Sequence, residues 1–551
     1  MNRVRIAQAM TDAADNQKMD VLFFPLAGRI LMMLRGNKLL LAGVLGALVT
    51  AGSAQAQWIM TPTDAQRFAQ ASFPEYLDGL TLSNDTDVAA DIQRNLNWLD
   101  KAFQKRGFTT QQLANGAHPM LYAELGPMQP NRPTVLFLMH FDGQSVSASE
   151  WSTDPWKPTL KIKDSRGIWM PQPNDRLMQP GLDPEWRVFG RSASDGKGVI
   201  SVFLTAVDAL KSARAATTVN IKVLLDSEEE RGSPHLAAVV NQNAARLKND
   251  GVVIFNGAVN TNNMPVITFG YRGSIQVDMT VFGPDPAAHS GAFGNVIVNP
   301  VQQLASLLAG LKDATGRVTL PGFYDRVKIS DDERKQLAAQ APQPGTIESR
   351  YGVTQLEKMA PNPVEAVQYP SLDVIGLRAG DTGRKAIYAI PSTATASINI
   401  RTVPETSPDY LYDLLKKYVT ANGFYIVRSD SPALQERNHN PKLISMSMMT
   451  SSGSSFAVRT QMASPLAKWA LDGVKAPSKG EPEKNRMLGV SPPINGALAA
   501  LKSAFAVVSL VNADNNSYSN DENMRIGNYI EGIRIIVSMM TTPFPEEEKT
   551  K

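Results

Sequence analysis

Three short segments of the chain are almost continuously apolar, and each is followed at once by polar residues. They are TVLFLM (134–139), NIKVLL (220–225) and GVVIF (251–255). Short apolar runs that are rich in branched residues are typical of strands buried on both faces of a parallel sheet. Between the first two runs, the segment 198–213 carries its apolar residues on one stripe of a helix. This rhythm predicts an α/β fold with a mostly parallel sheet and helices on both faces.

From about residue 271 the pattern changes to strict alternation of apolar and polar residues. The segments GSIQVDMTVFG (273–283) and TASINIRTV (395–403) alternate in this way, which predicts strands with one face in water. Two helical patterns accompany them, at 299–313 and at 407–423, and the first begins with an Asn-Pro pair suited to a helix start. Together these elements predict an antiparallel α+β domain.

The two patterns divide the chain into parts. The α+β domain, residues 271–425, is expected to be inserted into the parallel-sheet domain, whose two parts are residues 57–270 and 426–551. The segment 320–370 is rich in proline and charged residues and is expected to be a long loop within the insertion. Residues 1–56 belong to neither domain and have the composition of a leader.

The leader ends in the pattern of a secretory signal peptide. Arg35 and Lys38 precede the apolar run 39–52, and small residues follow it, so we expect cleavage after Ala56. The run is well short of the roughly 20 residues that a membrane-spanning helix needs, so a membrane anchor is the less favoured interpretation. The mature protein is expected to be periplasmic or secreted, with no stable membrane anchor after the signal is cleaved.

Charge and cysteine content narrow the classes of function. Of the 55 basic and 52 acidic residues in the chain, residues 1–56 hold six and three, which leaves 49 of each sign in the remainder. A neutral protein of this kind is not expected to bind nucleic acid or an anionic membrane surface. The chain has no cysteine, so a metal would have to be held by histidine and carboxylate side chains.

Polar residues capable of chemistry follow the three predicted buried strands. They are His140 and Asp142 after the first strand, Glu228 to Glu230 after the second and Asn256 after the third. Because parallel strands bring their carboxyl ends to one edge of a sheet, these side chains are expected to share one site. His140 and Asp142 are two residues apart and face the same way in an extended chain, where a carboxylate can orient an imidazole. Asp195, in a glycine-rich turn before a helix, is expected to join them.

Eight short blocks follow one another in a fixed order along the chain. They are MHFDGQ (139–144), WSTDPWKP (151–158), FGRSASDGKG (189–198), LLDSEEERGSP (224–234), FGYRGS (269–274), HSGAFGNVIVNP (289–300), IPSTATASINIRTVP (390–404) and NNSYSNDENMRIGN (515–528). In this order they resemble the two-zinc metallopeptidase family that includes aminoacylase, carnosinase, carboxypeptidase G and succinyl-diaminopimelate desuccinylase. One such block is a weak signal, whereas eight in register are a strong one. The resemblance implies a zinc-exopeptidase-like catalytic domain with an inserted α+β lid and dimerisation domain.

The resemblance also implies roles for the residues at the strand ends. His140 is implied to bind one zinc ion and Glu230 the other, with Asp195 bridging both. Asp142 is implied to support the site from outside the set of ligands. Glu229 is implied to be the general base that takes a proton from the metal-bound water, and adjacent glutamates at the end of a strand can divide these tasks.

Two positions depart from the family pattern. Asn256 stands where the family's next block has an aspartate, and Tyr518 stands where the C-terminal block has the last histidine ligand. An amide oxygen is a weaker zinc ligand than a carboxylate, and a phenol binds well only after it loses its proton. We therefore expect one or two Zn²⁺ ions, with Mn²⁺ or Co²⁺ as alternatives, and leave Asn256 and Tyr518 open as ligands. The remaining glutamate, Glu228, is assigned to solvent or to an outer layer of the site.

Three residues of the insertion match family positions that contact substrate. His289 is implied to grip the carbonyl oxygen of the substrate, Arg401 its carboxylate, and Asn295 is implied to assist. Arg401 falls on the polar side of its strand, where a guanidinium suits bidentate binding of a carboxylate, and a surface ion pair is the ordinary alternative. His289 lies in a glycine-flanked loop, which suits a donor that arrives when a lid closes. Many relatives pair through this domain, so a homodimer is expected.

These observations favour an exported metal-dependent hydrolase, which cleaves an amide or peptide bond in a small carboxylate-bearing substrate such as an N-acyl amino acid or a dipeptide. The attacking group would be metal-bound hydroxide, with Glu229 as general base. The alternative on the same fold is a catalytically altered or inactive member that binds a small molecule or peptide. A serine acylase is a further alternative, because Ser194 and Lys197 have the Ser-x-x-Lys spacing of penicillin-binding proteins and YSN (518–520) is faintly similar to their second motif. No Lys-Thr-Gly or Lys-Ser-Gly follows, however, and the chain has no Gly-x-Ser-x-Gly.

Overall fold

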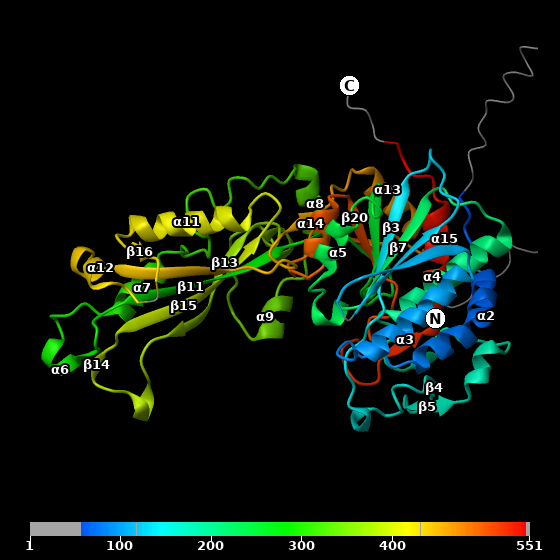
Figure 1. The fold of residues 1–551 in the computed structure, drawn as a ribbon, viewed down its shortest axis with the longest axis horizontal. Helices are drawn as coiled ribbons and strands as arrows, with labels where there is room; N and C mark the ends of the chain where they lie inside the picture. The colour runs from blue at the N-terminus through cyan, green and yellow to red at the C-terminus, as the bar shows by residue number, and fades with distance from the viewer. Residues whose placement is uncertain (1–56, 117, 430, 547–551) are drawn as a thin grey trace, which may run out of the picture. The chain divides into compact units, whose positions relative to one another are not determined.

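The computed structural model describes residues 57–116, 118–429 and 431–546, and the predicted leader and signal peptide lie outside these ranges. The largest sheet has eight strands in the order β1-β2-β7-β3-β8-β20-β9-β19. They are β1 (Phe108–Leu113), β2 (Met120–Leu125), β3 (Thr134–His140), β7 (Asn220–Asp226), β8 (Gly251–Phe255), β9 (Val266–Thr268), β19 (Glu483–Asn485) and β20 (Phe505–Val508). Figure 1 labels β3, β7 and β20 among them. The three apolar runs of the sequence form β3, β7 and β8, which pair in parallel as predicted.

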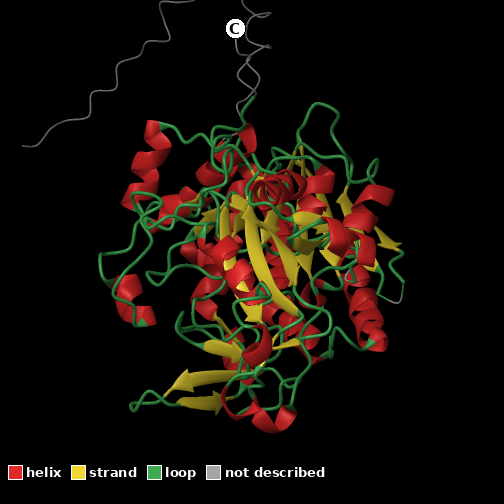
Figure 2. Cartoon of the chain, turned by 90° about the vertical axis from the view of Figure 1, so that its left-hand side faces the viewer, coloured by secondary structure: helices red, strands yellow, loops and turns green. Residues whose placement is uncertain are grey.

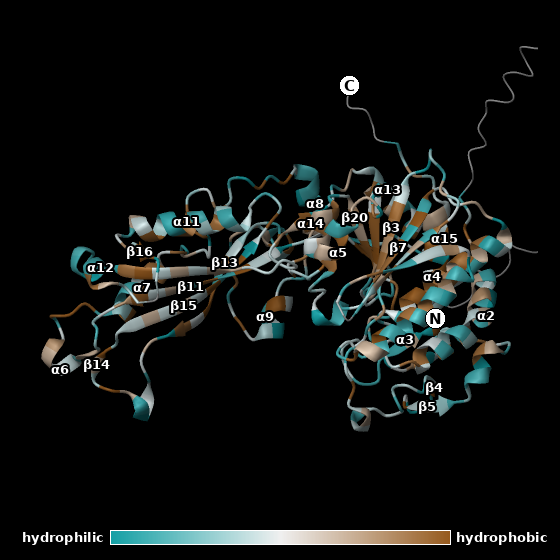
Figure 3. Ribbon diagram, viewed as in Figure 1, coloured by the Kyte–Doolittle hydropathy of each residue, from teal (hydrophilic) through white to brown (hydrophobic). Residues whose placement is uncertain are grey.

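Strand β3 shows why these runs are almost continuously apolar. Val135, Phe137 and Met139 face one hydrophobic core, and Leu136 and Leu138 face another on the opposite side. A strand that is covered on both faces gains from an apolar residue at each position. Figure 3 shows the central strands as hydrophobic segments, and Figure 2 shows helices on both sides of the strands. The predicted α/β architecture is confirmed.

Helices cover both faces of this sheet. One face is covered by α2 (Pro62–Thr81), α3 (Ala89–Gln104), α4 (Lys197–Ala213), α13 (Pro465–Lys475) and α15 (Ile526–Thr541), and the other by α5 (Leu236–Gln242) and α14 (Asn495–Leu501). Helix α4 positions the site, because it begins directly after Asp195 and Gly196. Gly196 has a φ of 81°, and a Cβ there would lie 3.0 Å from the backbone oxygen of His140. Glycine therefore allows this turn to approach the end of β3 closely.

The inserted domain has its own five-stranded sheet, in the order β13-β15-β11-β17-β16. Its strands are β11 (Gly273–Phe282), β13 (Ser371–Arg378), β15 (Thr393–Thr402), β16 (Tyr425–Val427) and β17 (Leu443–Met449), and its helices include α7 (Pro300–Ala309) and α11 (Pro408–Ala421). The alternation of β11 has the predicted effect: its apolar residues from Ile275 to Val281 are buried in the domain's core, and the polar residues between them are half-buried. Strand β17 pairs with β11, so the sheet extends to Met449, beyond residue 425.

The segment 320–370 is not the continuous loop that its composition predicted. It contains the helices α8 (Asp331–Ala339), α9 (Thr346–Tyr351) and α10 (Pro363–Ala366). Local capping explains two of them: Ser330 and Glu333 form a reciprocal capping box on α8, and Asn362 caps α10. The prediction was wrong because such short, polar helices lack the apolar stripe by which a helix is recognised in a sequence.

The remaining elements are short. A four-stranded sheet, in the order β21-β6-β4-β5, consists of β4 (Thr159–Lys163), β5 (Trp169–Gln172), β6 (Arg187–Phe189) and β21 (Asn523–Arg525). Two strand pairs, two helices and four 3-10 turns complete the list: β10 (Gly270–Tyr271) with β18 (Val458–Arg459), β12 (Ala288–His289) with β14 (Ala389–Ile390), α6 (Ser290–Phe293), α12 (Leu434–His439), η1 (Ala148–Glu150), η2 (Asn174–Met178), η3 (Glu229–Arg231) and η4 (Gly383–Lys385). Among the described residues, no helix has both the length and the apolar character that a membrane span requires.

Candidate active site

The ends of β3, β7 and β8 bring the residues predicted from the sequence to one edge of the large sheet. His140 is the last residue of β3 and pairs with Asp226, the last residue of β7. Glu229 and Glu230 follow β7 in the turn η3, and Asn256 directly follows β8. The parallel strands therefore deliver these side chains to the edge at which open α/β sheets bind their ligands.

The imidazole of His140 lies between two carboxylates. Its Nδ1 is 3.3 Å from Oδ1 of Asp142, and its Nε2 is 2.9 Å from Oδ1 of Asp195. Burial by itself lowers the pKa of His140, but the charge of Glu229 and the contacts with the two aspartates raise it well above its usual value. The structure thus brings together an imidazole and carboxylates that lie on separate loops of the chain.

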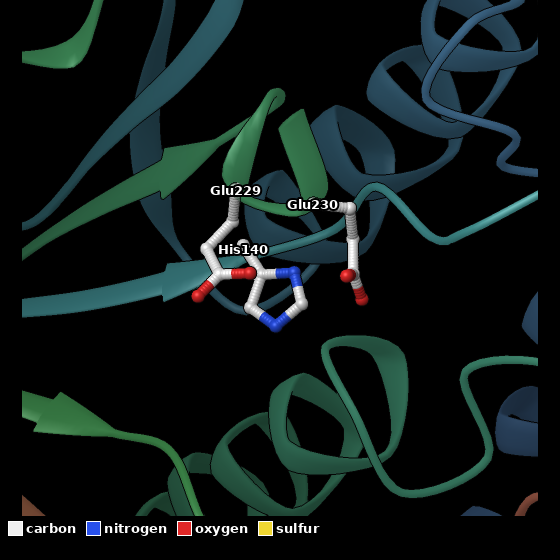
Figure 4. Close-up of side chains that lie close together, drawn as sticks. All are labelled: His140, Glu229 and Glu230. Atoms are coloured by element: carbon white, nitrogen blue, oxygen red, sulfur yellow. The ribbon is translucent and has the colours of Figure 1, made fainter. Parts of the chain in front are cut away.

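Asp142 holds the turn that carries the two glutamates. Its Oδ1 accepts a hydrogen bond from the backbone N–H of Glu229 at 3.1 Å, and its Oδ2 accepts one from the N–H of Glu230 at 3.0 Å. Figure 4 shows the side chains of His140, Glu229 and Glu230 gathered in one place. One ligand atom from each of these three residues lies within 4.8 Å of the others. Imidazole and carboxylate groups at this spacing are a donor set that suits a divalent cation.

His140, Asp195, Glu229 and Glu230, here called the cluster, carry more negative charge than the single imidazole can neutralise. Burial raises the pKa of Glu230 to about 8, and the nearby carboxylates of Asp195 and Glu229 add to the rise. Burial also raises the pKa of Glu229, although the charge of His140 opposes it. Carboxyl groups whose pKa values rise in this way lack a compensating positive charge, which a divalent cation would provide. The residues present therefore fit a metal ion.

The loop of Asp195 is held by Glu522, which comes from the far end of the chain. The buried carboxylate of Glu522 accepts hydrogen bonds from three backbone N–H groups. These belong to Ser192, Ser194 and Asp195, at 2.8, 2.9 and 2.8 Å. It also pairs with the guanidinium of Arg191 at 3.1 Å. Sequence reasoning missed Glu522, because it lies in a polar run and 327 positions separate it from Asp195.

Asn256, the first of the two departures from the family pattern, contacts the predicted base. Its side-chain amide donates a hydrogen bond to Oε1 of Glu229 at 3.4 Å. Asn256 and Glu229 both line the cavity beside the cluster. The amide that stands in place of a carboxylate therefore orients Glu229 in this structure.

Tyr518, the second departure, contacts Asp195 through its hydroxyl, although 56% of the residue is exposed. Burial raises the pKa of Asp195, but the contacts with His140 and with the hydroxyl of Tyr518 hold it below its usual value. Tyr518 has a φ of 64°, in the left-handed region that bulky residues seldom occupy. Backbone strain of this kind concentrates at functional sites, and here it accompanies a phenol that faces a predicted metal ligand.

Glu228 lies in the interior. Only 1% of the residue is exposed, and its carboxylate accepts a hydrogen bond from the side-chain amide of Asn115 at 2.6 Å. Nδ1 of His235 lies 2.7 Å from the same carboxylate, and Nδ1 of His118 lies 3.5 Å from it. Of the two expectations for Glu228, solvent is wrong, because these partners come from loops that the sequence pattern does not connect. The other expectation, a place in the outer layer of the site, fits Glu228 because this residue anchors the start of the turn that carries Glu229.

Arg401 lies on β15 next to the loop that follows β19. Its Nη1 donates a hydrogen bond to Oγ of Ser491 at 2.9 Å, and no carboxylate of the described residues forms an ion pair with it. Burial, together with the charge of Arg401, lowers the pKa of Arg272 to about 10. Two guanidinium groups that are close enough to repel each other favour a bound anion. The surroundings of Arg401 therefore suit a substrate carboxylate.

His289 and Asn295 lie apart from the clustered residues in this chain. His289 is exposed at the beginning of α6, where its Nδ1 accepts a hydrogen bond from the backbone N–H of Gly291 at 3.1 Å. Asn295 is exposed and has a φ of 62°. Neither residue lines the cavity beside the cluster, so their contact with substrate stays a prediction.

A cavity of about 270 Å³ opens beside the cluster. Its polar end is formed by residues of the cluster, and its remaining wall is mainly apolar. The polar residues include His140, Glu229, Asn256 and Tyr518. A concave, mostly apolar pocket with a few convergent polar groups is the usual form of a small-molecule site.

Ser194 and Lys197 do not form a serine–lysine pair. The hydroxyl of Ser194 is buried and donates to Glu522 at 2.9 Å. Nζ of Lys197 instead donates to the backbone oxygen of Gly79 at 3.0 Å. The geometry therefore gives the serine acylase interpretation no activated nucleophile.

Comparison with protein families identifies the inserted domain. A family model described as a peptidase dimerisation domain matches residues 269–424. The match begins and ends within two residues of the boundaries predicted from the change in sequence pattern, 271 and 425. It includes three strands of the five-stranded sheet, β11, β13 and β15, and ends after α11. The other two strands, β16 and β17, follow the matched region.

Curated relatives extend the similarity to the catalytic part. The Beta-Ala-His dipeptidase of Mus musculus is 27% identical over 348 residues, which cover 61% of this chain and 64% of that enzyme. The Cys-Gly metallodipeptidase of Schizosaccharomyces pombe is 24% identical over 491 residues, which cover 83% of this chain and 91% of that enzyme. The chain thus spans less than two thirds of the mouse enzyme and most of the yeast enzyme.

Solved structures show the same fold. An M20 family metallo-carboxypeptidase from Sulfolobus solfataricus superposes with a TM-score of 0.61 at 23% identity, covering 86% of this chain and 99% of that chain. The di-peptidase Dug1p from Saccharomyces cerevisiae superposes with a TM-score of 0.57 at 19% identity, covering 89% of this chain and 100% of that chain. These structures share the fold of the chain, and its inserted domain matches a peptidase dimerisation domain. The resemblance to the M20 peptidases that the sequence blocks predict is confirmed by this match and by the dipeptidase relatives.

Proposed function

We propose that the protein is an exported, metal-dependent hydrolase that cleaves the amide or peptide bond of a small carboxylate-bearing substrate, a dipeptide or an N-acyl amino acid. The observation that carries this proposal is the convergence of His140, Glu229 and Glu230 within 4.8 Å at the carboxyl edge of a parallel sheet. Similarity to two enzymes named dipeptidases supports the choice of substrate class.

Three side chains are proposed to hold the metal: His140, Asp195 and Glu230. One or two Zn²⁺ ions suit these nitrogen and oxygen donors, and Mn²⁺ or Co²⁺ are the alternatives. A bound ion of this kind would polarise the substrate's carbonyl oxygen and lower the pKa of water. Asn256 and Tyr518 offer a neutral amide and a phenol, which are weaker donors than the carboxylate and imidazole of the family pattern.

Glu229 is proposed to be the general base. Its carboxylate lies beside the other cluster residues, and Asn256 steadies one of its oxygens. Burial raises the pKa of Glu229, which makes its carboxylate a better proton acceptor than an exposed one. It would take a proton from the attacking water and pass it to the leaving nitrogen. Asp142 positions Glu229 through the backbone N–H of the turn.

Arg401 and its neighbour Ser491 are proposed to bind the substrate carboxylate. The guanidinium has no carboxylate partner among the described residues and lies near a second guanidinium, that of Arg272. His289 and Asn295 are proposed to reach the substrate through closure of the inserted domain or from a second chain, because neither lines the cavity in this chain.

A homodimer through the inserted domain is part of the proposal. The match to a peptidase dimerisation domain supports it. The edge strand β13 adds a second argument, because Val374, Ile375 and Leu377 are 46%, 58% and 59% exposed on it. An exposed edge strand with apolar side chains is suited to pairing with another chain.

Export rests on the sequence of residues 1–56. Expression of the whole chain in a bacterium with two membranes, followed by cell fractionation, tests it. We expect the protein in the periplasmic fraction, with an N-terminus that begins at Gln57. Recovery of the uncleaved chain from the cytoplasm contradicts export and leaves the hydrolase proposal to its own test.

The hydrolase proposal is tested with the mature protein, freed of metal and then loaded with Zn²⁺, Mn²⁺ or Co²⁺. We expect hydrolysis of dipeptides or N-acyl amino acids that a chelator abolishes and added metal restores. Glu229→Gln is expected to lower kcat by about 10²- to 10⁴-fold, whereas Glu481→Gln, an exposed control, leaves kcat unchanged. Metal-loaded protein that binds these compounds and cleaves none of them supports the binding-protein alternative instead.

A further inference from the structure

We infer that the cavity beside the cluster is a specificity pocket for a large apolar side chain, and that this side chain belongs to the carboxylate-bearing residue of the substrate. The inference rests on the proposed hydrolase and adds a preference among substrates to it. Two observations carry it: the apolar composition of the cavity wall, and the presence in that wall of Glu229 and of the two chain neighbours of Ser491, which contacts Arg401.

The wall of the cavity is apolar away from the cluster. Leu138, Ile254 and Val507 come from the ends of three neighbouring strands of the large sheet, and Val490 and Pro492 come from the loop after β19. Apart from tyrosines, the titratable side chains that line the cavity are His140, Asp226 and Glu229. All three lie at the strand ends beside the cluster. A charged side chain that entered the apolar part would lose its hydration without gaining a partner.

Two parts of the cavity wall relate to groups that are proposed to act on the substrate. Glu229, the proposed base, lines the cavity. Val490 and Pro492 line it as well, and the hydroxyl of Ser491 between them accepts the hydrogen bond from Arg401. The cavity wall therefore includes the proposed base and both chain neighbours of the serine that contacts Arg401.

This placement decides which substrate side chain enters. In a dipeptide or an N-acyl amino acid, the one side chain between the scissile nitrogen and the carboxylate is that of the C-terminal residue. With the scissile bond at Glu229 and the carboxylate at Arg401, this side chain faces the apolar wall. A volume of about 270 Å³ leaves room for leucine or phenylalanine and leaves most of the cavity unfilled by glycine. Each methylene placed in an apolar pocket favours binding of the transition state by about tenfold or more.

The first experiment compares kcat/KM for dipeptides that differ at one position. We expect Gly-Leu and Gly-Phe to exceed Gly-Gly and Gly-Asp by at least about tenfold, whereas Leu-Gly gains no such advantage over Gly-Gly. Equal values for Gly-Leu and Gly-Gly, or a preference for Gly-Asp, overturn the inference. An advantage of Leu-Gly equal to that of Gly-Leu overturns the assignment to the C-terminal residue.

A variant at the rim tests the pocket itself. Val490 is 58% exposed, so Val490→Trp can fill the mouth of the cavity without disturbing the core. We expect it to lower the ratio of kcat/KM for Gly-Leu over Gly-Gly by about tenfold. Val353→Trp is the matched control, since Val353 is 41% exposed and does not line the cavity. An unchanged ratio in Val490→Trp contradicts the inference.

Binding to Glu229→Gln separates this inference from the proposed function. Calorimetry with intact Gly-Leu and Gly-Gly reports the pocket without any turnover. Tighter binding of Gly-Leu by about tenfold, in a wild-type protein that cleaves neither, supports the pocket and rejects the hydrolase. Hydrolysis by the wild type, with equal affinity of Glu229→Gln for the two dipeptides, supports the hydrolase and rejects the pocket. Absence of binding by both dipeptides rejects the pocket.

Discussion

The carboxylate of Glu522 accepts the backbone N–H of Asp195 at 2.8 Å, across 327 positions of the sequence. Glu522 is 1% exposed, so this bond is shielded from competing water. Asp195 in turn places its Oδ1 2.9 Å from Nε2 of His140. Glu522 is therefore a positioning residue for the proposed bridging ligand, and it links the C-terminal part of the catalytic domain to the metal site.

Replacing Glu522 with glutamine is the first prediction. The amide nitrogen of Gln would face backbone N–H groups that need an acceptor, so the loop of Asp195 would shift. We expect Glu522→Gln to weaken zinc binding by about 10- to 100-fold, as loss of an outer partner of a metal ligand commonly does. Titration with a competing zinc indicator measures the effect. Glu185→Gln, at an exposed residue paired with Arg525, serves as control, and equal zinc affinity of the two variants would argue against a positioning role.

Asp142 gives the second prediction, since its two oxygens accept the N–H groups of Glu229 and Glu230. Asparagine keeps the shape but offers one acceptor oxygen in place of two. We expect Asp142→Asn to lower zinc affinity and kcat/KM by about 10- to 100-fold each. Far-ultraviolet circular dichroism should show an intact fold. A variant with wild-type zinc affinity and a reduced thermal midpoint would show that Asp142 serves folding alone.

Tyr518 gives the third prediction. Histidine is tolerated in the left-handed region better than tyrosine, and its imidazole is a good neutral zinc ligand. Tyr518 has a φ of 64°. We therefore expect the Tyr518→His variant to bind zinc about tenfold more tightly than the wild type, which is a gain of roughly 1.4 kcal/mol in the free energy of zinc binding. Tyr518→Phe removes only the hydroxyl that contacts Asp195 and is the matched comparison. Weaker zinc binding by Tyr518→His than by Tyr518→Phe would place the residue outside the ligand set.

The ion pair between Glu75 and Arg106 gives a prediction about pH. Burial raises the pKa of Glu75, but the guanidinium of Arg106, at 2.7 Å, outweighs it and holds the pKa below its ordinary value of 4.5. A lowered pKa in the folded state means that the pair stabilises the fold fully above about pH 4.5 and that this stability is lost as the pH falls through the folded pKa.

Urea unfolding of wild type and Glu75→Gln measures this contribution. At pH 7 we expect the variant to be less stable by about 1.5–3 kcal/mol, the usual contribution of a hydrogen bond to a charged group. The difference should shrink as the pH falls below about 4.5. Asp332→Asn, at a side chain that is 86% exposed, is expected to change stability little at either pH. If the difference in unfolding free energy between wild type and Glu75→Gln grew as the pH fell, the prediction of a lowered pKa for Glu75 would be contradicted.

The parts of the site that sequence could predict are those tied to strand ends. His140, Glu229 and Asn256 follow buried runs that only a parallel sheet explains, so their meeting at one edge follows from topology. Glu228 shows the limit of this reasoning. Its burial depends on Asn115 and His118, whose loop approaches the turn only in the folded chain, and a run of glutamates has no periodicity that reveals such contacts.

The fold shows the same division. The strands β3, β7 and β8 are mainly apolar and were predicted within a residue, because burial on both faces leaves a strong pattern. The antiparallel pair of the edge strand β1 and its neighbour β2 was not predicted, since β1 has mostly polar residues at exposed or half-buried positions. The extension of the inserted sheet to β17 was also missed, because pairing with β11 is a long-range contact that a local pattern does not record.

The account depends most on a cation held by His140 together with carboxylates. Zinc K-edge X-ray absorption of the zinc-loaded protein tests this directly, because an imidazole ligand gives a characteristic outer-shell signal. We expect nitrogen and oxygen neighbours only, with one imidazole, and loss of the imidazole signal in His140→Ala. A protein that binds no zinc, or a spectrum that His140→Ala leaves unchanged, would contradict the account.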